Sequence, residues 1–307
     1  MKLDQIANEI AAEIEADAKA VENAADAKTP GLTPGPFGMA IAMVDGSLIR
    51  AGSSETFPIQ SISKVFALSL ALEKLGDTVF ERVGREPSGD PFNSVIDLER
   101  TQGIPRNPFV NAGALVVVDI LVEQFGDNAR GAVLDLVKGG IKDATSKAAV
   151  MLDPEVLNEG GDLNRAMLHF MAHHDNVCSP VDAIMDTYAR QCAVSVDCVG
   201  LAQAGCYLAD TRIAANAAND RAKRMRTTLA LMMTCGHYDG SGDFAVRVGL
   251  PAKSGVGGGI LAIAPGIASI AVWSPNLDQH GNSMLGVRAL EMLNARTGWS
   301  VFGPPVG

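Results

Sequence analysis

The sequence predicts an α+β protein, in which a five-stranded antiparallel sheet is flanked by helices and joined to an all-helical lobe. Three observations support this fold class: a hairpin signal near the N-terminus, a long helical middle, and strand-like runs followed by a helix near the C-terminus. Because both ends of the chain supply strands, we expect residues 1–75 and 235–307 to form one mixed domain, and residues 76–234 to form a helical domain.

The N-terminal elements follow from apolar spacing and turn residues. Apolar residues recur every three or four positions over residues 3–14, which predicts an amphipathic helix lying on the sheet. Residues 29–36 hold three prolines and two glycines and indicate a loop. Asp45-Gly46 then separates two strand-like runs, residues 37–44 and 47–51, and this is the strongest hairpin signal in the chain.

The middle and the C-terminal part differ in pattern. Residues 84–93 form a turn-rich connector, and residues 111–233 are rich in alanine, leucine and valine at helical spacing. The expected later elements are three strands and a closing helix, at residues 244–249, 258–264, 268–274 and 283–294.

Composition narrows the class of partner. The 307 residues carry a formal net charge of -10, which argues against nucleic acid or an anionic membrane surface. Acidic residues interrupt the N-terminal segment, and no stretch reaches the length of a membrane span, so a cytoplasmic location is expected. The five cysteines are odd in number and lack zinc-site spacing, which favours free thiols.

Two short motifs carry the candidate chemistry. Ser61 and Lys64 are three residues apart at the start of an apolar helix, so their side chains face the same way. Lys253-Ser254-Gly255 precedes a strand-like run far downstream. Each motif alone is common, but S-x-x-K together with K-[ST]-G is typical of serine acyl-transferases of the β-lactamase and penicillin-binding fold.

Acyl transfer by a serine needs a base and oxyanion donors, and the residues of these two motifs can supply both. A serine hydroxyl needs a base to become a nucleophile, and Lys64 is the candidate if burial, the helix N-terminus and the charge of Lys253 lower its pKa. The backbone N–H groups of Ser61 and Val256 are the candidate oxyanion donors. The glycines that follow Ser254 are expected to let a substrate approach the strand closely.

Two further motifs have competing interpretations. Tyr238 lies in a polar, glycine-rich turn, and it is either a proton relay or a half-buried tyrosine that closes the turn. His169 and His173 have a spacing that suits a metal on a helix, but no third ligand is evident, and a polar helix end is favoured. We therefore expect no metal at these histidines.

Several longer motifs together resemble the serine-dependent glutaminases. They occur at residues 57–64, 84–89, 107–114, 235–239, 249–260 and 273–283, in the order and approximate spacing of that family, and the resemblance covers about residues 37–295. It implies hydrolysis of L-glutamine to L-glutamate and ammonia through an acyl-serine, in a homodimer or homotetramer without cofactor.

The resemblance also implies a role for individual residues. Ser61 matches the nucleophile, Lys64 the base, and Tyr238 the catalytic tyrosine of the family. The substrate-binding positions would be Ser61, Asn111, Asn164, Tyr188, Tyr238 and Val256.

The chain departs from the family pattern in two places. No tyrosine occurs between residues 24 and 36, where family members usually carry one. Neither Glu155 nor Glu159 has the expected seven-residue offset from Asn164, and either is a candidate for the substrate ammonium. Two alternatives stay open: a different serine amidohydrolase of the same fold, such as a β-lactamase or peptidase, and a non-catalytic relative that binds an amino acid.

Overall fold

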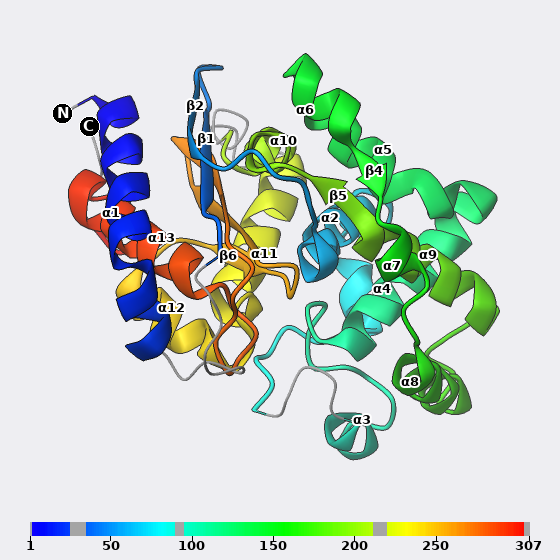
Figure 1. The fold of residues 1–307 in the computed structure, drawn as a ribbon. Helices are drawn as coiled ribbons and strands as arrows, with labels where there is room; N and C mark the ends of the chain where they lie inside the picture. The colour runs from blue at the N-terminus through cyan, green and yellow to red at the C-terminus, as the bar shows by residue number, and fades with distance from the viewer. Residues whose placement is uncertain (1, 25–34, 90–94, 211–219, 304–307) are drawn as a thin grey trace.

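The computed structural model describes residues 2–24, 35–89, 95–210 and 220–303, and Figure 1 follows the chain through them. Its main sheet has five antiparallel strands in the order β2-β1-β8-β7-β6. The strands are β1 (Gly38–Met43), β2 (Leu48–Gly52), β6 (Ala252–Ser254), β7 (Gly259–Ala264) and β8 (Ala268–Trp273). The predicted five-stranded antiparallel sheet is therefore confirmed, and both ends of the chain contribute to it.

The predicted hairpin is formed by β1 and β2. Asp45 Oδ1 accepts hydrogen bonds from the backbone N–H and the hydroxyl of Ser47, at 2.8 and 2.7 Å. Gly46 has a φ of 95°, a conformation that costs glycine little. This turn sets a register in which Ala40 is paired with Arg50.

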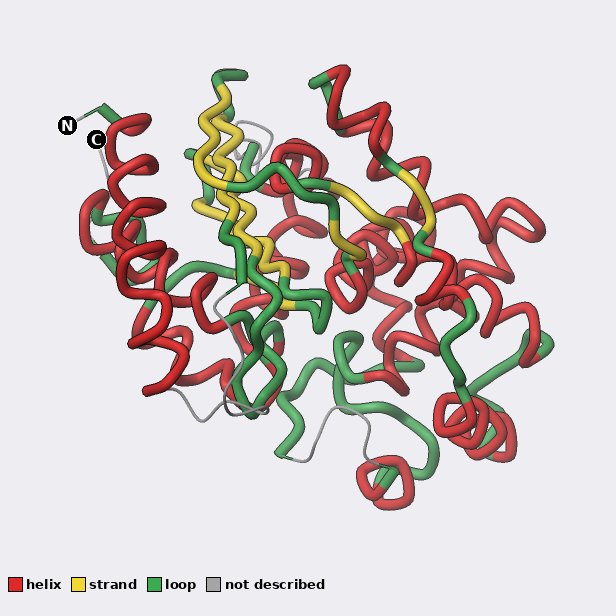
Figure 2. The backbone as a smooth tube through the Cα atoms, in the orientation of Figure 1, coloured by secondary structure: helices red, strands yellow, loops and turns green. Residues whose placement is uncertain are grey.

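Helices cover both faces of the sheet, as Figures 1 and 2 show. α1 (Leu3–Ala24), α12 (Ser241–Arg247) and α13 (Met284–Thr297) lie on one face, where their apolar side chains share one core cluster with the strands. α10 (Cys198–Gly205) packs against β1 and β8 from the other face. The helices expected at the two ends of the sequence are thus confirmed.

The segment between β2 and α11 (Asp220–Cys235) is mostly helical. Besides α10, its described helices are α2 (Ser63–Leu75), α3 (Ile96–Arg100), α4 (Asn111–Phe125), α5 (Ala129–Gly140), α6 (Ala144–Ala149), α7 (Pro154–Leu157), α8 (Asp162–His173) and α9 (Val181–Ala193). Three short strands, β3 (Phe57–Pro58), β4 (Met151–Leu152) and β5 (Val194–Val196), form a small antiparallel sheet in the order β3-β5-β4. The lobe expected to be all-helical therefore contains β4 and β5. The proposed limits of the two domains stay a prediction.

The prediction of a strand at residues 244–249 is wrong, because residues 244–247 belong to α12 and the edge strand of the sheet is β6. Phe244 and Val248 are buried, whereas Val246 is 87% exposed. In a strand these three side chains would share one face, but burial at positions four apart is helical. Stacking of Phe244 on the ring of His237, with centroids 3.6 Å apart, holds the helix against the preceding turn.

Two sequence predictions concern segments that lie mostly outside the described residues. The loop expected at residues 29–36 lies outside the described residues except for its last two positions, and so does most of the segment that lacks the family tyrosine. In the described ranges, no helix combines the length and the hydropathy needed to cross a bilayer.

Candidate active site

Ser61 lies in a short 3-10 helix (η1, Gln60–Ile62) that leads directly into α2. Its residue is 8% exposed, whereas Lys64 is 1% exposed. Gln60, just before the serine, has a φ of +47°, which is uncommon for a residue with a side chain. Such strain costs on the order of 1–3 kcal/mol and tends to be retained at functional sites. The serine is therefore presented by a strained, well-packed segment.

Lys64 is buried next to the start of α4. Its Nζ donates hydrogen bonds to the carbonyl oxygen of Phe109 at 3.1 Å and to Oδ1 of Asn111 at 2.7 Å. Burial lowers the pKa of Lys64 to about 8, while the nearby Cys192 thiol acts in the opposite direction. At neutral pH a useful fraction of the amine is thus neutral, which a general base requires.

Asn111 joins several of the predicted site residues. Its Oδ1 accepts from Lys64 and, at 3.4 Å, from the hydroxyl of Tyr188, while its Nδ2 donates to Oδ1 of Asn164 at 3.4 Å. Tyr188 is 8% exposed, and burial is the main cause that raises its pKa well above the ordinary value. Three elements, α4, α8 and α9, therefore place amide and phenol groups next to the lysine.

A local hydrogen-bond pattern holds the turn that leads into α4. Oδ1 of Asn107 accepts from the backbone N–H groups of Phe109 and Val110, at 2.9 and 3.1 Å. A side chain at Gly113 would place its Cβ 1.9 Å from the carbonyl oxygen of Asn107. The first turn of α4 can therefore fold back closely on the Asn107 loop, which fixes the position of Asn111.

Tyr238 begins a second 3-10 helix (η6, Tyr238–Gly240) and has a φ of +54°. Burial raises its pKa to about 12, and the hydroxyl groups of Ser61 and Ser254 lie close enough to lower it in part. Oγ of Ser241 donates to the carbonyl oxygen of Tyr238 at 2.8 Å and holds the turn. The tyrosine is thus half-buried in a turn and also directed at Ser61, so both expected descriptions of its surroundings apply.

Lys253 lies beneath this tyrosine. Its Nζ is 4.2 Å from the centre of the Tyr238 ring, and it donates to the carbonyl oxygens of Gly236 and Ser254 at 3.0 and 2.6 Å. Burial first, and the charge of Lys64 second, lower the pKa of Lys253 well below its ordinary value. The expected repulsion between the two lysines therefore lowers the pKa of Lys253, whereas burial is what lowers the pKa of Lys64.

The glycines after Ser254 have a packing role that the sequence did not indicate, and the expected approach of substrate stays a prediction. A Cβ at Gly255 would lie 2.6 Å from the carbonyl oxygen of Ile59, and a Cβ at Gly257 would lie 2.2 Å from that of Pro58. In both cases the added Cβ would meet the backbone of the segment that carries Ser61. The glycines therefore allow the Lys-Ser-Gly loop to pack directly on the backbone before the nucleophile.

The remaining predicted residues lie at the surface. Val256 is 39% exposed in the loop between β6 and β7. Glu155 and Glu159 are both exposed, near α7. They differ in one respect: the charge of Glu159 contributes to the raised pKa of Tyr188 and of Cys192, after burial. Glu159 therefore lies within electrostatic reach of the Asn111 cluster.

Two groups near the lysine had no signal in the sequence. The carbonyl oxygen of Phe109 is the second acceptor for Lys64, and a backbone contact between distant segments has no residue-type signature. Cys192 is buried, with Sγ 3.9 Å from Oγ of Ser63. These two residues are 129 positions apart in the sequence, so no local pattern indicates their contact.

One group of side chains within the described chain has the spacing of a metal site. Asp119, Glu123 and Cys178 place their ligand atoms within 4.8 Å of one another. However, Arg82 forms ion pairs with both carboxylates, and Asp119 also accepts backbone N–H groups from Cys178 and Ser179. Both acids are therefore paired with the same arginine, which indicates a structural ion-pair network.

The fold and the site together define the class: a serine-dependent acyl-transfer enzyme of the β-lactamase-like fold. A model of the Glutaminase family matches residues 30–302. The chain belongs to the glutaminase family.

Individual relatives agree with this assignment. A glutaminase of Rhizobium rhizogenes is 53% identical over 276 residues, which cover 88% of each chain. A solved structure described as a probable glutaminase, ybaS, is 33% identical with a TM-score of 0.83, over 98% of this chain and 99% of that one. The Bacillus subtilis glutaminase YbgJ, solved as a covalent complex with 5-oxo-L-norleucine, is 26% identical with a TM-score of 0.78, over 98% and 100% of the two chains.

Proposed function

We propose that this chain hydrolyses L-glutamine to L-glutamate and ammonia through an acyl ester on Ser61. As a member of the glutaminase family, it is a glutamine amidohydrolase of the β-lactamase-like fold. Asn111 provides the strongest support for the site, because it contacts the candidate base Lys64 and also Tyr188 and Asn164. The candidate base and three candidate substrate-binding groups thus meet in one place.

In the first half of the proposed reaction, neutral Lys64 takes the proton of Ser61 as Oγ attacks the side-chain carbonyl carbon of glutamine. The carbonyl oxygen becomes an oxyanion that is stabilised by the backbone N–H groups of Ser61 and Val256. Tyr238 then transfers a proton to the leaving nitrogen, so that ammonia departs as the C–N bond breaks. The acyl ester is left on the serine.

In the second half, a water molecule attacks the ester carbonyl and gives one proton to the phenolate oxygen of Tyr238. The ester C–O bond then breaks as protonated Lys64 returns its proton to Oγ of Ser61, which releases L-glutamate and restores the enzyme. A free amino acid carries a carboxylate and an ammonium on its Cα. The site therefore needs hydrogen-bond donors for the carboxylate and an anionic partner for the ammonium. Asn111, Asn164 and Tyr188 can donate to the carboxylate. We assign the ammonium to Glu159, which acts electrostatically on Tyr188.

The proposed activity predicts ammonia release from L-glutamine by the purified protein. Asparagine, whose side chain is one methylene shorter, should be hydrolysed at least about tenfold more slowly, because one methylene can misplace the reacting carbon. Coupled detection of ammonia measures both rates. Turnover of the β-lactam nitrocefin without turnover of glutamine would instead identify a different serine amidohydrolase.

The two candidate acids give a prediction about substrate affinity. Glu159→Gln should raise the KM for glutamine by about tenfold or more, because a charge-assisted contact with the ammonium is lost. Glu155→Gln is the matched control, since it removes the same charge four residues away, and its KM should change by less than about twofold. Steady-state kinetics of both variants separate the assignments. The opposite order of effects would transfer the role to Glu155.

Tyr238→Phe tests the proton relay. The change removes one oxygen and keeps the ring over Lys253, so kcat should fall by about a hundredfold or more, with little change in melting temperature. If the tyrosine only closes the turn, kcat should be nearly unchanged, and stability should fall by about 1 kcal/mol at most. A variant that retains more than about half of the wild-type kcat would contradict the relay.

The family and the composition also support proposals on oligomeric state, partner class, location and cofactor. We propose a homodimer or homotetramer, as the family resemblance implies. The formal net charge of -10 favours a small-molecule substrate over nucleic acid or an anionic membrane. A cytoplasmic location and the absence of a cofactor remain parts of the same proposal.

A further inference from the structure

A large cavity opens away from Ser61, on the other side of α2. Its volume is about 670 Å³, which lies in the range of small-molecule sites, whereas the cavity beside Tyr238 measures only about 20 Å³. Its walls come from α2, α5, α11, the β1–β2 turn and the 3-10 helix η4 (Cys206–Leu208). None of the residues that we assign to glutamine hydrolysis lines it.

The middle of this cavity is apolar. Leu70, Leu136 and Leu208 line it, and the hydroxyl of Tyr207 is hydrogen-bonded to Oγ of Ser69 at 2.7 Å. Those two hydroxyl groups therefore satisfy each other. An occupant that fills the centre must be apolar to gain free energy from burial.

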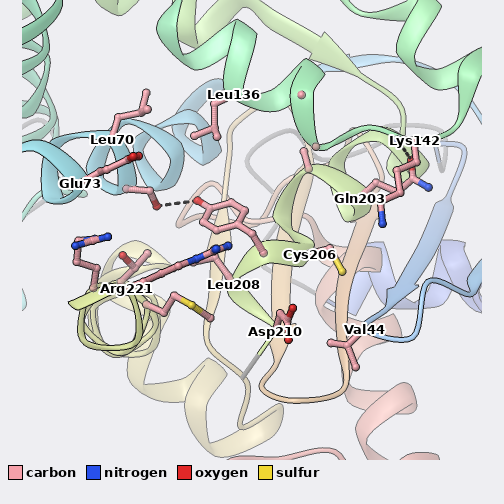
Figure 3. Close-up of a pocket in the computed structure, with 18 of the residues that line it drawn as sticks. Val44, Leu70, Glu73, Leu136, Lys142, Gln203, Cys206, Leu208, Asp210 and Arg221 are labelled. Carbon is pink, nitrogen blue, oxygen red and sulfur yellow. Dashed lines mark hydrogen bonds between the residues drawn. The ribbon is translucent and has the colours of Figure 1, made fainter. Parts of the chain in front are cut away.

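Charged side chains stand around this apolar centre. Figure 3 shows Glu73 from α2 and Arg221 from α11 at one end of the cavity and Lys142 at the other, with Leu136 and Leu208 between them. Arg221 and Arg224 are three residues apart on α11, so both can face the cavity. The cavity thus presents positive and negative charge close together.

Three of these charges, those of Glu73, Lys142 and Arg224, have no ion-pair partner within the described chain. Lys223 pairs with Asp77, but no described carboxylate pairs with half-buried Arg224, and no described cation pairs with Glu73. A ligand with only a carboxylate would leave Glu73 unpaired, and a ligand with only an ammonium would leave Arg224 unpaired. A ligand that carries both groups matches both charges.

We propose that this cavity is a second small-molecule site, which binds a zwitterion with an apolar body. The chemical class is a free amino acid with an aliphatic or aromatic side chain. Its carboxylate would pair with Arg224, its ammonium with Glu73, and its side chain would fill the apolar centre. The site is separate from the glutamine site and does not depend on the proposed function.

Three probes of one shape test the charge pattern: L-phenylalanine, 3-phenylpropanoate, which lacks the ammonium, and 2-phenylethylamine, which lacks the carboxylate. Titration calorimetry on Ser61→Ala protein saturated with L-glutamine keeps the probes out of the glutamine site. We expect one L-phenylalanine per chain, and at least about tenfold weaker binding of each analogue. Absence of L-phenylalanine binding, or equal binding of the three probes, would overturn the proposal.

Filling the cavity with a large side chain tests whether L-phenylalanine binds there. Each variant is made in the same Ser61→Ala protein. A Cβ at Gly139, in the last turn of α5, meets no atom within 4 Å, so Gly139→Trp can place its ring in the cavity without a clash at Cβ. This variant should lose L-phenylalanine binding. Gly242→Trp is the matched control, because Gly242 is also a helical glycine with open space at Cβ, but it lies in α12. Loss of binding in the control, or retained binding in Gly139→Trp, contradicts the assignment.

Single charge changes test the two contacts, again in the Ser61→Ala protein. Arg224→Gln should weaken L-phenylalanine and 3-phenylpropanoate by about tenfold and leave 2-phenylethylamine nearly unchanged. Glu73→Gln should weaken L-phenylalanine and 2-phenylethylamine and spare 3-phenylpropanoate. Melting temperatures of both variants control for folding. If neither variant changes the affinity for L-phenylalanine, the proposed recognition is wrong.

Discussion

Ser61→Ala should reduce glutamine turnover by about ten-thousandfold or more, because the acyl ester cannot form without the hydroxyl. The residue is 8% exposed, and the change removes a single oxygen, so the melting temperature should change little. Ammonia release under saturating glutamine measures the loss. Ser63→Ala is the matched control, since it removes a buried hydroxyl two residues away, and it should retain most of the activity.

A covalent label checks the same assignment without turnover. The relative YbgJ forms a covalent complex with 5-oxo-L-norleucine on reaction with 6-diazo-5-oxo-L-norleucine. Intact-mass measurement after the same reaction should show one adduct on the wild-type chain and none on the Ser61→Ala chain. Wild-type ammonia release or an adduct in that variant would place the nucleophile elsewhere.

Lys64→Met should reduce kcat nearly as far as Ser61→Ala, because the serine loses its base. The double variant should be little worse than either single variant, since two residues that act as one unit are not additive. Losses that multiply in the double variant would indicate a separate role for the lysine. Methionine suits this test because it fills most of the buried volume without a charge, so circular dichroism should show an intact fold.

The pH profile separates a base from a purely structural lysine. Lys64 acts only when neutral, and burial lowers its pKa to about 8, so kcat/KM should rise with pH up to about 8 and then level off. Below that pH the amine is protonated and the reaction slows tenfold per pH unit. In Lys64→Met this titration should disappear from the residual activity. An unchanged profile in that variant would assign the titration to another group.

The hairpin and the serine–lysine pair could be predicted from the sequence because each depends on a short local pattern. The hairpin needs only Asp45-Gly46 between two apolar runs, and the S-x-x-K pair needs only one turn of helix. The strand expected at residues 244–249 failed because a run with Phe244, Val246 and Val248 also fits a helix. The packed chain decides between them: Phe244 and Val248 are buried, Val246 is exposed, and Phe244 stacks on the ring of His237.

Residue types at set spacings were enough to predict the candidate chemistry of the site, from the serine, the lysine one turn later, the Lys-Ser-Gly motif and the long family motifs. How these groups lie relative to one another follows from the packing of distant segments. Lys64 has a lowered pKa because distant segments bury it against Phe109 and Asn111. The proposal of Glu159 rather than Glu155 also depends on the fold, because it rests on the charge that Glu159 exerts on Tyr188. Burial and long-range contact depend on the whole packed chain, so no local spacing encodes them.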